Sequence, residues 1–274
     1  FLISSTQIGE DYQVSDKGVE EIFRKVIDKF KNVFNFYNLY ANKLNSKFYI
    51  LNSKNILDQW ILARLNEVVQ KITAKMEAYE LTEAARILMD FIDDLSNWYV
   101  RRSRKRLSAL PTLSYVILET SKLMAPFAPF IAEMIYKSVG RQKSGVNSIH
   151  LEDWPKSNLK LNTQNLKLLE DMAETRRLAS LALAKRLEAG IKVRQPLASL
   201  SVKHQASGIR RNKELLAVLK EEVNVKEIIF DSKIKGEIEL DTEITPELKT
   251  EGILRDLTRL IQGLRQDAGY QPKD

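Results

Sequence analysis

The apolar stripe along residues 84–106 limits the possible folds of this chain more than any other feature. Its members recur every three or four residues, which is typical of one buried face of an amphipathic helix, and they are Ala84, Leu88, Phe91, Leu95 and Trp98. At about 100° per residue, Arg102 falls near the centre of this face, and Lys105 and Arg106 fall close to it. Because an unpaired guanidinium group is costly to bury, the core must end here. We therefore expect the cations to meet water, carboxylates or a phosphate-bearing partner.

Two interpretations of the basic run at residues 101–106 are open. It is a solvated helix end if the cations complement the helix macrodipole and pair with Asp90, Asp93 and Asp94. It is a nucleic-acid contact if the cations bind phosphates, and the candidates are then Arg101, Arg102, Arg104, Lys105 and Arg106. Trp98 beside them is either part of the core or a platform on which an unpaired base stacks.

The composition excludes several kinds of site. The chain has 274 residues, a net charge of +7 and a pI near 9.3, which suits a polyanionic partner. It contains no cysteine, so disulfides, thiolate zinc sites and cysteine nucleophiles are excluded. The two histidines, His150 and His204, are far apart in the sequence, which argues against a histidine metal cluster. We expect neither a metal site nor a cofactor site.

The sequence shows no apolar run near the roughly 20 residues that cross a bilayer, and no signal peptide is recognisable. We therefore expect a cytoplasmic protein that does not enter membranes. The chain begins inside an apolar run, Phe1-Leu2-Ile3, and its last residues also look cut. We expect it to be a piece of a longer polypeptide.

Residues 1–155 are predicted to form a helical bundle. Helical periodicity places helices at about 16–42, 56–79, 83–105 and 111–139. Their expected N-caps are Ser15, then Asn55 or Ser53, then Thr82. Pro126 and Pro129 should break the fourth helix, because proline lacks an N–H and crowds the preceding turn. A polar linker follows Trp154-Pro155, and we place the domain boundary there.

Residues 156–274 differ in character and predict a small α+β module. Helices are expected at about 163–189, 209–220 and 246–268, and strands at 197–202, 225–230 and 238–240. Gly190 would cap the first helix, and Pro196 would stand at the start of the first strand or on a sheet edge. The apolar residues expected to point inward from the last helix are Ile253, Leu257, Leu260, Ile261 and Leu264. The predicted fold class is mainly α, a helical bundle followed by this module.

No catalytic signature is present. The sequence lacks a P-loop, a dinucleotide-binding glycine motif, a nucleophile elbow, a zinc-protease helix and a calcium loop. Adjacent carboxylates such as Glu20 and Glu21 diverge by about 100° on a helix, so they are poorly placed to form a convergent acid–base pair. The sequence thus argues against a stand-alone enzyme and indicates no catalytic residue.

A second group of candidate RNA contacts follows the helix predicted at 163–189. Lys192, Arg194 and Gln195 would be accessible there for contacts with phosphates or bases. The alternative is an exposed β-edge whose charges prevent pairing with another strand.

Several segments of the chain resemble isoleucyl-tRNA synthetases. The two most specific are Asp-Asp-Leu-Ser-Asn-Trp-Tyr-Val-Arg-Arg-Ser-Arg at 93–104 and Gly-Ile-Lys-Val-Arg-Gln-Pro-Leu at 190–197. The other matching segments are 58–65, 123–130, 148–155, 251–257 and 264–270. Among these, the proline-broken helix and the Trp-Pro exit are shared with valyl and leucyl enzymes. The lack of cysteine departs from isoleucyl enzymes that carry a C-terminal zinc-binding segment.

This resemblance implies the tRNA anticodon-binding region of an isoleucyl-tRNA synthetase. Such a region holds the anticodon stem-loop and positions the tRNA for ATP-dependent attachment of isoleucine. The family's ATP-binding signatures, of the His-Ile-Gly-His and Lys-Met-Ser-Lys-Ser types, do not occur here, nor does its editing domain. We therefore expect a monomeric fragment that is inactive alone and needs no cofactor, whereas ATP and Mg²⁺ serve the parent enzyme. The alternative is a helical scaffold or interaction module of a valyl- or leucyl-type synthetase without direct base recognition.

Overall fold

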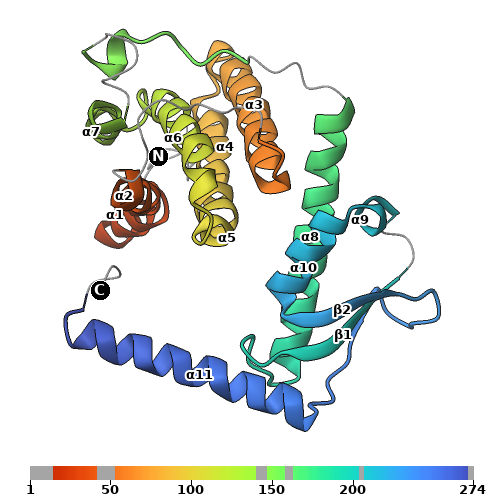
Figure 1. The fold of residues 1–274 in the computed structure, drawn as a ribbon. Helices are drawn as coiled ribbons and strands as arrows, with labels where there is room; N and C mark the ends of the chain where they lie inside the picture. The colour runs from red at the N-terminus through yellow and green to blue at the C-terminus, as the bar shows by residue number, and fades with distance from the viewer. Residues whose placement is uncertain (1–14, 42–52, 140–146, 158–162, 204–206, 271–274) are drawn as a thin grey trace. The chain divides into compact units, whose positions relative to one another are not determined.

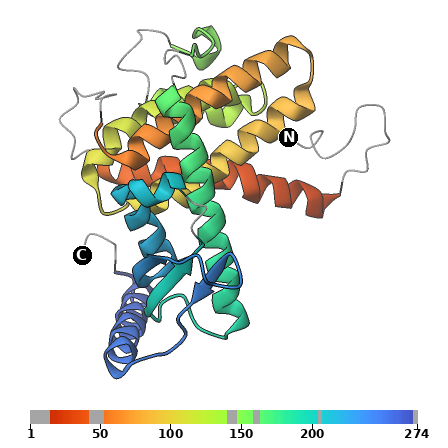
Figure 2. The same ribbon diagram turned by 90° about the vertical axis from the view of Figure 1, so that its right-hand side faces the viewer.

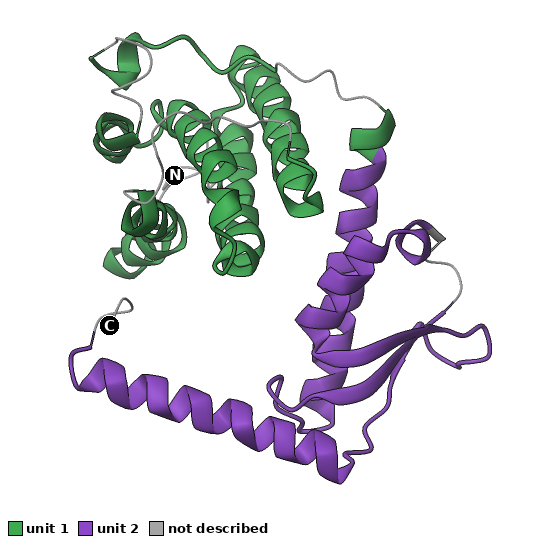
Figure 3. Cartoon of the chain, in the orientation of Figure 1, with its two compact units in different colours: residues 1–166 green, residues 167–274 purple. Residues whose placement is uncertain are grey.

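A computed structural model describes residues 15–41, 53–139, 147–157, 163–203 and 207–270. The chain divides into two compact units, unit 1 at Phe1–Leu166 and unit 2 at Lys167–Asp274 (Figure 3). The described part of unit 1 is helical, whereas unit 2 adds a three-stranded sheet. This confirms the mainly α class with a small α+β part, and the boundary after Pro155 stays a prediction. None of the described helices has both the length and the apolar character needed to cross a bilayer.

Unit 1 has four long helical stretches at the predicted places. The first consists of α1 (Asp16–Ile22), the π-helical segment η2 (Phe23–Asp28) and α2 (Lys29–Ala41). The second is α3 (Ile56–Glu77). The third consists of α4 (Leu81–Asp93), the π-helical segment η3 (Asp94–Val100) and α5 (Arg101–Ser103). The fourth consists of α6 (Leu110–Met124) and α7 (Pro129–Val139), with short 3₁₀ turns at Leu107–Ala109 and Ile149–Leu151.

Two of the three predicted helix caps are confirmed. The Ser15 hydroxyl accepts a hydrogen bond from the Gly18 N–H at 3.1 Å. The Asn55 side-chain oxygen accepts one from the Leu57 N–H at 3.0 Å. The predicted cap at Thr82 is wrong, because α4 begins at Leu81, two residues before the predicted start, and Thr82 is buried within its first turn.

The core of unit 1 lies among α3, α4 and α6, which are neighbours in both views (Figures 1 and 2). Trp60 and Ile61 of α3 and Leu88 and Phe91 of α4 are almost completely buried, and the two helices pack against one another. Full burial of one such side chain contributes about 1.5–3 kcal/mol. The helix at 111–139 is interrupted between Met124 and Pro129, as the two prolines predict. The bundle predicted for this part of the chain is therefore confirmed.

Unit 2 is built around one long helix and a small sheet. Its elements are α8 (Thr163–Glu188), β1 (Leu197–Val202), α9 (Ser207–Arg211), α10 (Lys213–Val223), β2 (Val225–Phe230), β3 (Ile238–Leu240) and α11 (Pro246–Asp267). The strand order is β2-β1-β3, with β1 parallel to β2 and antiparallel to β3. Gly190 follows α8 with a φ of 67°, so the predicted left-handed cap is confirmed. Pro196 directly precedes β1, the central strand.

The apolar stripe of α11 does not point inward, contrary to the sequence prediction. Ile253, Leu257, Leu260, Ile261 and Leu264 are between 47% and 61% exposed. Only Leu248 and Gly252, in the first two turns, are buried. Periodicity shows that a helix is amphipathic, but it does not show whether another element covers the apolar face.

We expect the double substitution Leu257→Gln and Leu260→Gln to lower the free energy of unfolding by about 0.5 kcal/mol or less per site, because both side chains are half exposed. Urea unfolding followed by far-UV circular dichroism measures this. As a control on the same helix, Leu248→Ala should cost about 2 kcal/mol or more, since Leu248 is only 8% exposed. A comparable loss in the double variant would mean that the stripe packs within this chain.

Candidate nucleic-acid interface

The π-helical segment η3 changes which residues of the third helical stretch face the core. A π turn bonds residue i to residue i+5, so it holds one residue more than an α turn and rotates the side chains that follow. Beyond Leu95 the buried residues are Tyr99, Val100 and Ser103. Trp98 and Arg102, which an uninterrupted α-helix would turn inward, lie instead at the margin of the core and are partly exposed. The predicted position of Arg102 at the centre of the stripe is thus wrong.

Trp98 and Arg102 are in contact with one another. The guanidinium carbon of Arg102 lies 4.8 Å from the centre of the Trp98 ring. Such a cation–π contact contributes about 0.5–1 kcal/mol at an exposed site. The two residues are four apart on the helix, so they are neighbours on its surface. An indole ring and a guanidinium group are both groups on which an unpaired base can stack.

The exposed cations beside this pair are Arg101, Arg104 and Lys105. The Nε of Arg101 donates to the Asn97 carbonyl at 2.8 Å, which holds its side chain along the helix. Among the described residues, neither Arg104 nor Lys105 has an ion-pair partner. The end of the third helical stretch therefore presents positive charge to solvent next to a stacked Trp–Arg pair.

Arg106 is placed differently from the other predicted contacts, because it faces the interior. Its guanidinium forms a two-pronged ion pair with Asp58 of α3, with Nη1–Oδ2 and Nη2–Oδ1 distances of 2.7 and 2.5 Å. Asp58 is completely buried and also accepts from the Tyr99 hydroxyl at 2.7 Å and the Ser53 hydroxyl at 2.6 Å. This cluster joins the start of α3 to the end of the third helical stretch. A tRNA contact by Arg106 stays a prediction.

The charges of this cluster depend on one another. Burial on its own would raise the pKa of Asp58, but hydrogen bonds from Arg106, Ser53 and Tyr99 outweigh it and hold that pKa below the ordinary value. Burial and the neighbouring Asp58 charge raise the pKa of the Tyr99 hydroxyl, which stays protonated and donates. The cluster is therefore a carboxylate enclosed by donors, a structural arrangement with no free acid or base.

Two of the acidic residues that precede the basic run, Asp93 and Asp94, are bound to other helices. The Asp93 carboxylate pairs with Lys29 of α2 and accepts from the Asn97 side chain at 2.7 Å. The Asp94 carboxylate accepts from the Nε of Arg64 in α3 at 2.9 Å. These contacts fasten the third helical stretch to the bundle, so that its basic end has a defined position.

The second predicted group, Lys192, Arg194 and Gln195, lies in the loop between α8 and β1, and only Lys192 is exposed. The Nε of Arg194 pairs with Asp256 at 2.8 Å. The Gln195 side chain donates to the carbonyls of Pro196 and Leu248 and lies against Gly252, whose missing side chain makes room for it. The loop leads into the central strand, so the alternative of an exposed β-edge is wrong. Contacts of these residues with tRNA stay a prediction.

Sequence reasoning missed the residue that holds this loop. Arg186 of α8 is completely buried, and its guanidinium donates to the carbonyls of Lys192, Gln195 and Asn224 at 3.1, 2.8 and 2.8 Å. The signal in the sequence is weak, because Lys185 and Arg186 together resemble an ordinary basic helix end. Arg186 fixes the backbone that carries the second group.

The arrangement of these residues is suited to binding a nucleic acid. Among the described residues, no three or more His, Cys, Asp or Glu side chains form a group that could hold a metal ion. The two features that stand out are the basic helix end of unit 1 and the braced loop of unit 2. The first combines cations with a stacking surface, which are the two components of single-stranded RNA recognition.

Comparison with known proteins identifies the family. Residues 58–203, more than half of the chain, match the model described as the anticodon-binding domain of tRNA ligase. Similar proteins are the isoleucine–tRNA ligases of Clostridium tetani (33% identity over 92% of this chain), Dehalococcoides mccartyi (32% over 100%) and Chlamydia trachomatis (34% over 97%). The chain spans 26%, 30% and 27% of the length of these relatives, respectively. The chain therefore belongs to the anticodon-binding domain family of tRNA ligases.

Proposed function

We propose that this chain is the tRNA anticodon-binding region of an isoleucyl-tRNA synthetase. The observation that carries the proposal is the basic end of the third helical stretch, where exposed Arg101, Arg104 and Lys105 belong to the same short segment as the Trp98–Arg102 contact. In this proposal the cations neutralise phosphates of the anticodon stem-loop, and the Trp98–Arg102 pair receives an unpaired base. Lys192 is a further phosphate contact.

The proposed role within the parent enzyme is positional. The chain holds the anticodon stem-loop of an isoleucine tRNA, so that the acceptor end reaches an active site outside the matched region. ATP, Mg²⁺ and isoleucine act there, and no residue of this chain is assigned to that chemistry. The relatives are named isoleucine–tRNA ligases, and this chain matches less than a third of their length. We propose that it acts as a monomer in the cytoplasm.

We expect the double substitution Arg104→Glu and Lys105→Glu to weaken binding of an isoleucine-tRNA transcript about tenfold or more at low salt. Log affinity falls as log salt rises, and each lost phosphate contact should make this negative slope shallower by about 0.7–0.9. Fluorescence titration of the full tRNA and of its anticodon stem-loop, over a series of salt concentrations, measures both quantities.

The matched control is Lys17→Glu with Lys31→Glu, which makes the same charge change at exposed positions of α1 and α2. It should change affinity much less. Salt-insensitive binding, or equal losses in both variants, would favour the scaffold without base recognition. No binding by the full tRNA would contradict the proposal outright.

A further inference from the structure

We propose that unit 2 carries a second RNA-backbone surface, at the edge of the sheet where β1 and β2 end. We call it the basic edge and define it by Lys203, Arg210, Arg211, Lys233 and Lys235. This inference rests on the proposed function in one respect, because it takes the partner to be a tRNA. It adds a tRNA contact that is separate from the proposed anticodon site of unit 1.

The sheet topology brings these residues together. Because β1 and β2 are parallel, their carboxyl ends lie at the same edge, and Val202 pairs there with both Phe230 and Ile238. Lys203 follows β1, and its N–H donates to the Glu237 carbonyl at 2.9 Å. Lys233 and Lys235 lie in the turn from β2 to β3 at that edge. Helix α9, the next described element after β1, adds Arg210 and Arg211.

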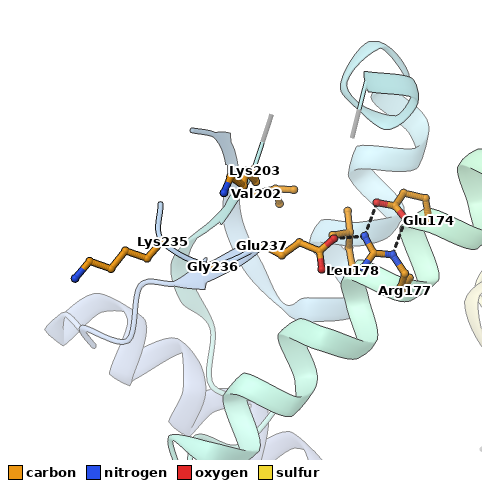
Figure 4. Close-up of a pocket in the computed structure, with 8 residues that line it drawn as sticks. All are labelled: Glu174, Arg177, Leu178, Val202, Lys203, Lys235, Gly236 and Glu237. Carbon is orange, nitrogen blue, oxygen red and sulfur yellow. Dashed lines mark hydrogen bonds and ion pairs between the residues drawn. The ribbon is translucent and has the colours of Figure 1, made fainter. Parts of the chain in front are cut away.

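The basic edge has an excess of positive charge. Among the described residues, Lys203, Arg211, Lys233 and Lys235 have no ion-pair partner, and the last three are exposed. The nearby acid Glu237 turns instead toward Arg177 of α8, which also binds Glu174, whereas Lys235 extends in the other direction (Figure 4). Arg177 thus holds Glu237 and Glu174 together, a group with one net negative charge, and Asp231, whose carboxylate accepts from the Lys233 N–H, adds another at this edge. The five cations of the basic edge outnumber these charges.

An aromatic contact distinguishes the basic edge from a simple cluster of lysines. The guanidinium carbon of Arg210 lies 5.6 Å from the centre of the Phe230 ring, at the end of β2. Unit 1 uses the same combination, a partly exposed aromatic ring with an arginine over it and cations around it. A stacked guanidinium offers a plane to an unpaired base.

The spread of the charges favours a nucleic-acid strand over a single phosphate or an acidic protein. The cations come from the end of β1, a turn and a short helix. Two of them, Lys203 and Lys235, line a pocket that also contains Glu174 and Glu237, and these two carboxylates disfavour a single bound anion there (Figure 4). A single anion needs donors that converge on it, whereas a backbone is followed by a row of cations. The Arg210–Phe230 contact adds a feature that an acidic peptide does not require.

The test is the triple substitution Lys203→Glu, Lys233→Glu and Lys235→Glu in the full chain, titrated with an isoleucine-tRNA transcript across a salt series. We expect affinity to fall about tenfold or more at low salt and the salt slope to decrease by about 1 per residue lost. The control is Lys167→Glu, Lys185→Glu and Lys249→Glu, which changes the net charge of the same unit equally at exposed positions elsewhere. Far-UV circular dichroism confirms that both variants fold.

Each outcome decides a different point. Equal losses in the triple variant and its control overturn the basic edge. If Arg104→Glu with Lys105→Glu weakens binding but the triple variant does not, the basic edge fails and the proposed function stands. If only the triple variant weakens binding, the basic edge stands and the unit 1 site fails. A triple variant that keeps its tRNA affinity but loses binding of a polyglutamate peptide identifies an acidic protein partner and overturns the proposal.

Discussion

Replacing Asp58 by asparagine is expected to lower the free energy of unfolding of unit 1 by about 3–5 kcal/mol. Asp58 is completely buried, and its two oxygens accept hydrogen bonds from Arg106, Tyr99 and Ser53. Asparagine keeps the shape, but it removes the charge and replaces one acceptor oxygen by a donor NH₂ group that would face other donors. Arg106 would then be a partly buried cation without its counter-charge.

Tryptophan fluorescence during urea unfolding measures this loss selectively, because the three tryptophans of the chain, Trp60, Trp98 and Trp154, all lie in unit 1. The control is Asp153→Asn, since the Asp153 side chain is 91% exposed and its ion pair with Lys156 is long, at 3.8 Å. It should change stability by about 0.5 kcal/mol or less. If Asp58→Asn costs no more than this control, the cluster around Asp58 does not hold the helix ends together.

The Asp58 effect should depend on pH in a defined direction. The pKa of Asp58 is lower in the folded protein than its ordinary value, so the carboxylate stabilises the fold above its unfolded-state pKa of about 3.9. That stabilisation is lost as the pH falls through the folded-state pKa, because the protonated acid no longer pairs with Arg106. The stability difference between Asp58→Asn and the wild type should therefore be largest near pH 7 and shrink well below pH 4.

The same cluster determines which arginines are useful in binding experiments. Charge reversal at Arg106 would place a carboxylate against Asp58 and destabilise unit 1, so a loss of tRNA binding in that variant would not identify a contact. Arg104 and Lys105 are exposed and have no such partner among the described residues. This is why the binding test uses Arg104 and Lys105 and leaves Arg106 unchanged.

The parts of the fold that were predictable are those with local causes. The long helices of unit 1 follow from apolar periodicity, and the break between Met124 and Pro129 follows from the chemistry of proline. The strands β1 and β2 have the predicted bounds, since short runs of β-branched and apolar residues are flanked there by turn residues. These features need no knowledge of distant contacts.

The features that were missed depend on distant partners. Nothing local in residues 94–100 indicates a π-helical segment, yet that segment decides that Tyr99 is buried and that Arg102 is at the margin. The buried Asp58 is explained only by Arg106, which is 48 residues away. The periodicity of α11 predicts an apolar face but not what covers it, and the structure leaves that face exposed. Sequence patterns thus located the basic run but not the contacts that orient it.

Replacing Arg186 by methionine is expected to destabilise unit 2 by about 3 kcal/mol. Methionine fills much of the same volume, but the carbonyls of Lys192, Gln195 and Asn224 lose a buried donor, at about 1–3 kcal/mol each. Part of this loss is offset. Burial disfavours the charged guanidinium and lowers the pKa of Arg186 to about 10, yet the group is still charged at pH 7. The methionine variant removes this buried charge and therefore its desolvation cost. The lost hydrogen bonds outweigh this gain because three of them disappear together.

The two units allow this prediction to be checked within one sample. Unit 2 contains no tryptophan, so Arg186→Met should shift the far-UV circular dichroism transition in urea while the tryptophan fluorescence transition of unit 1 stays in place. Hydrogen exchange should also become faster at the Gln195 amide, which donates to the Lys192 carbonyl at 3.0 Å in the loop that Arg186 holds. The control is Lys185→Met, one residue earlier on α8, where the side chain is 54% exposed and pairs with Glu188. Equal stability of the two variants would mean that the loop is held by the contacts of Gln195 and Asn224 with their own neighbours, and that the buried guanidinium is not needed.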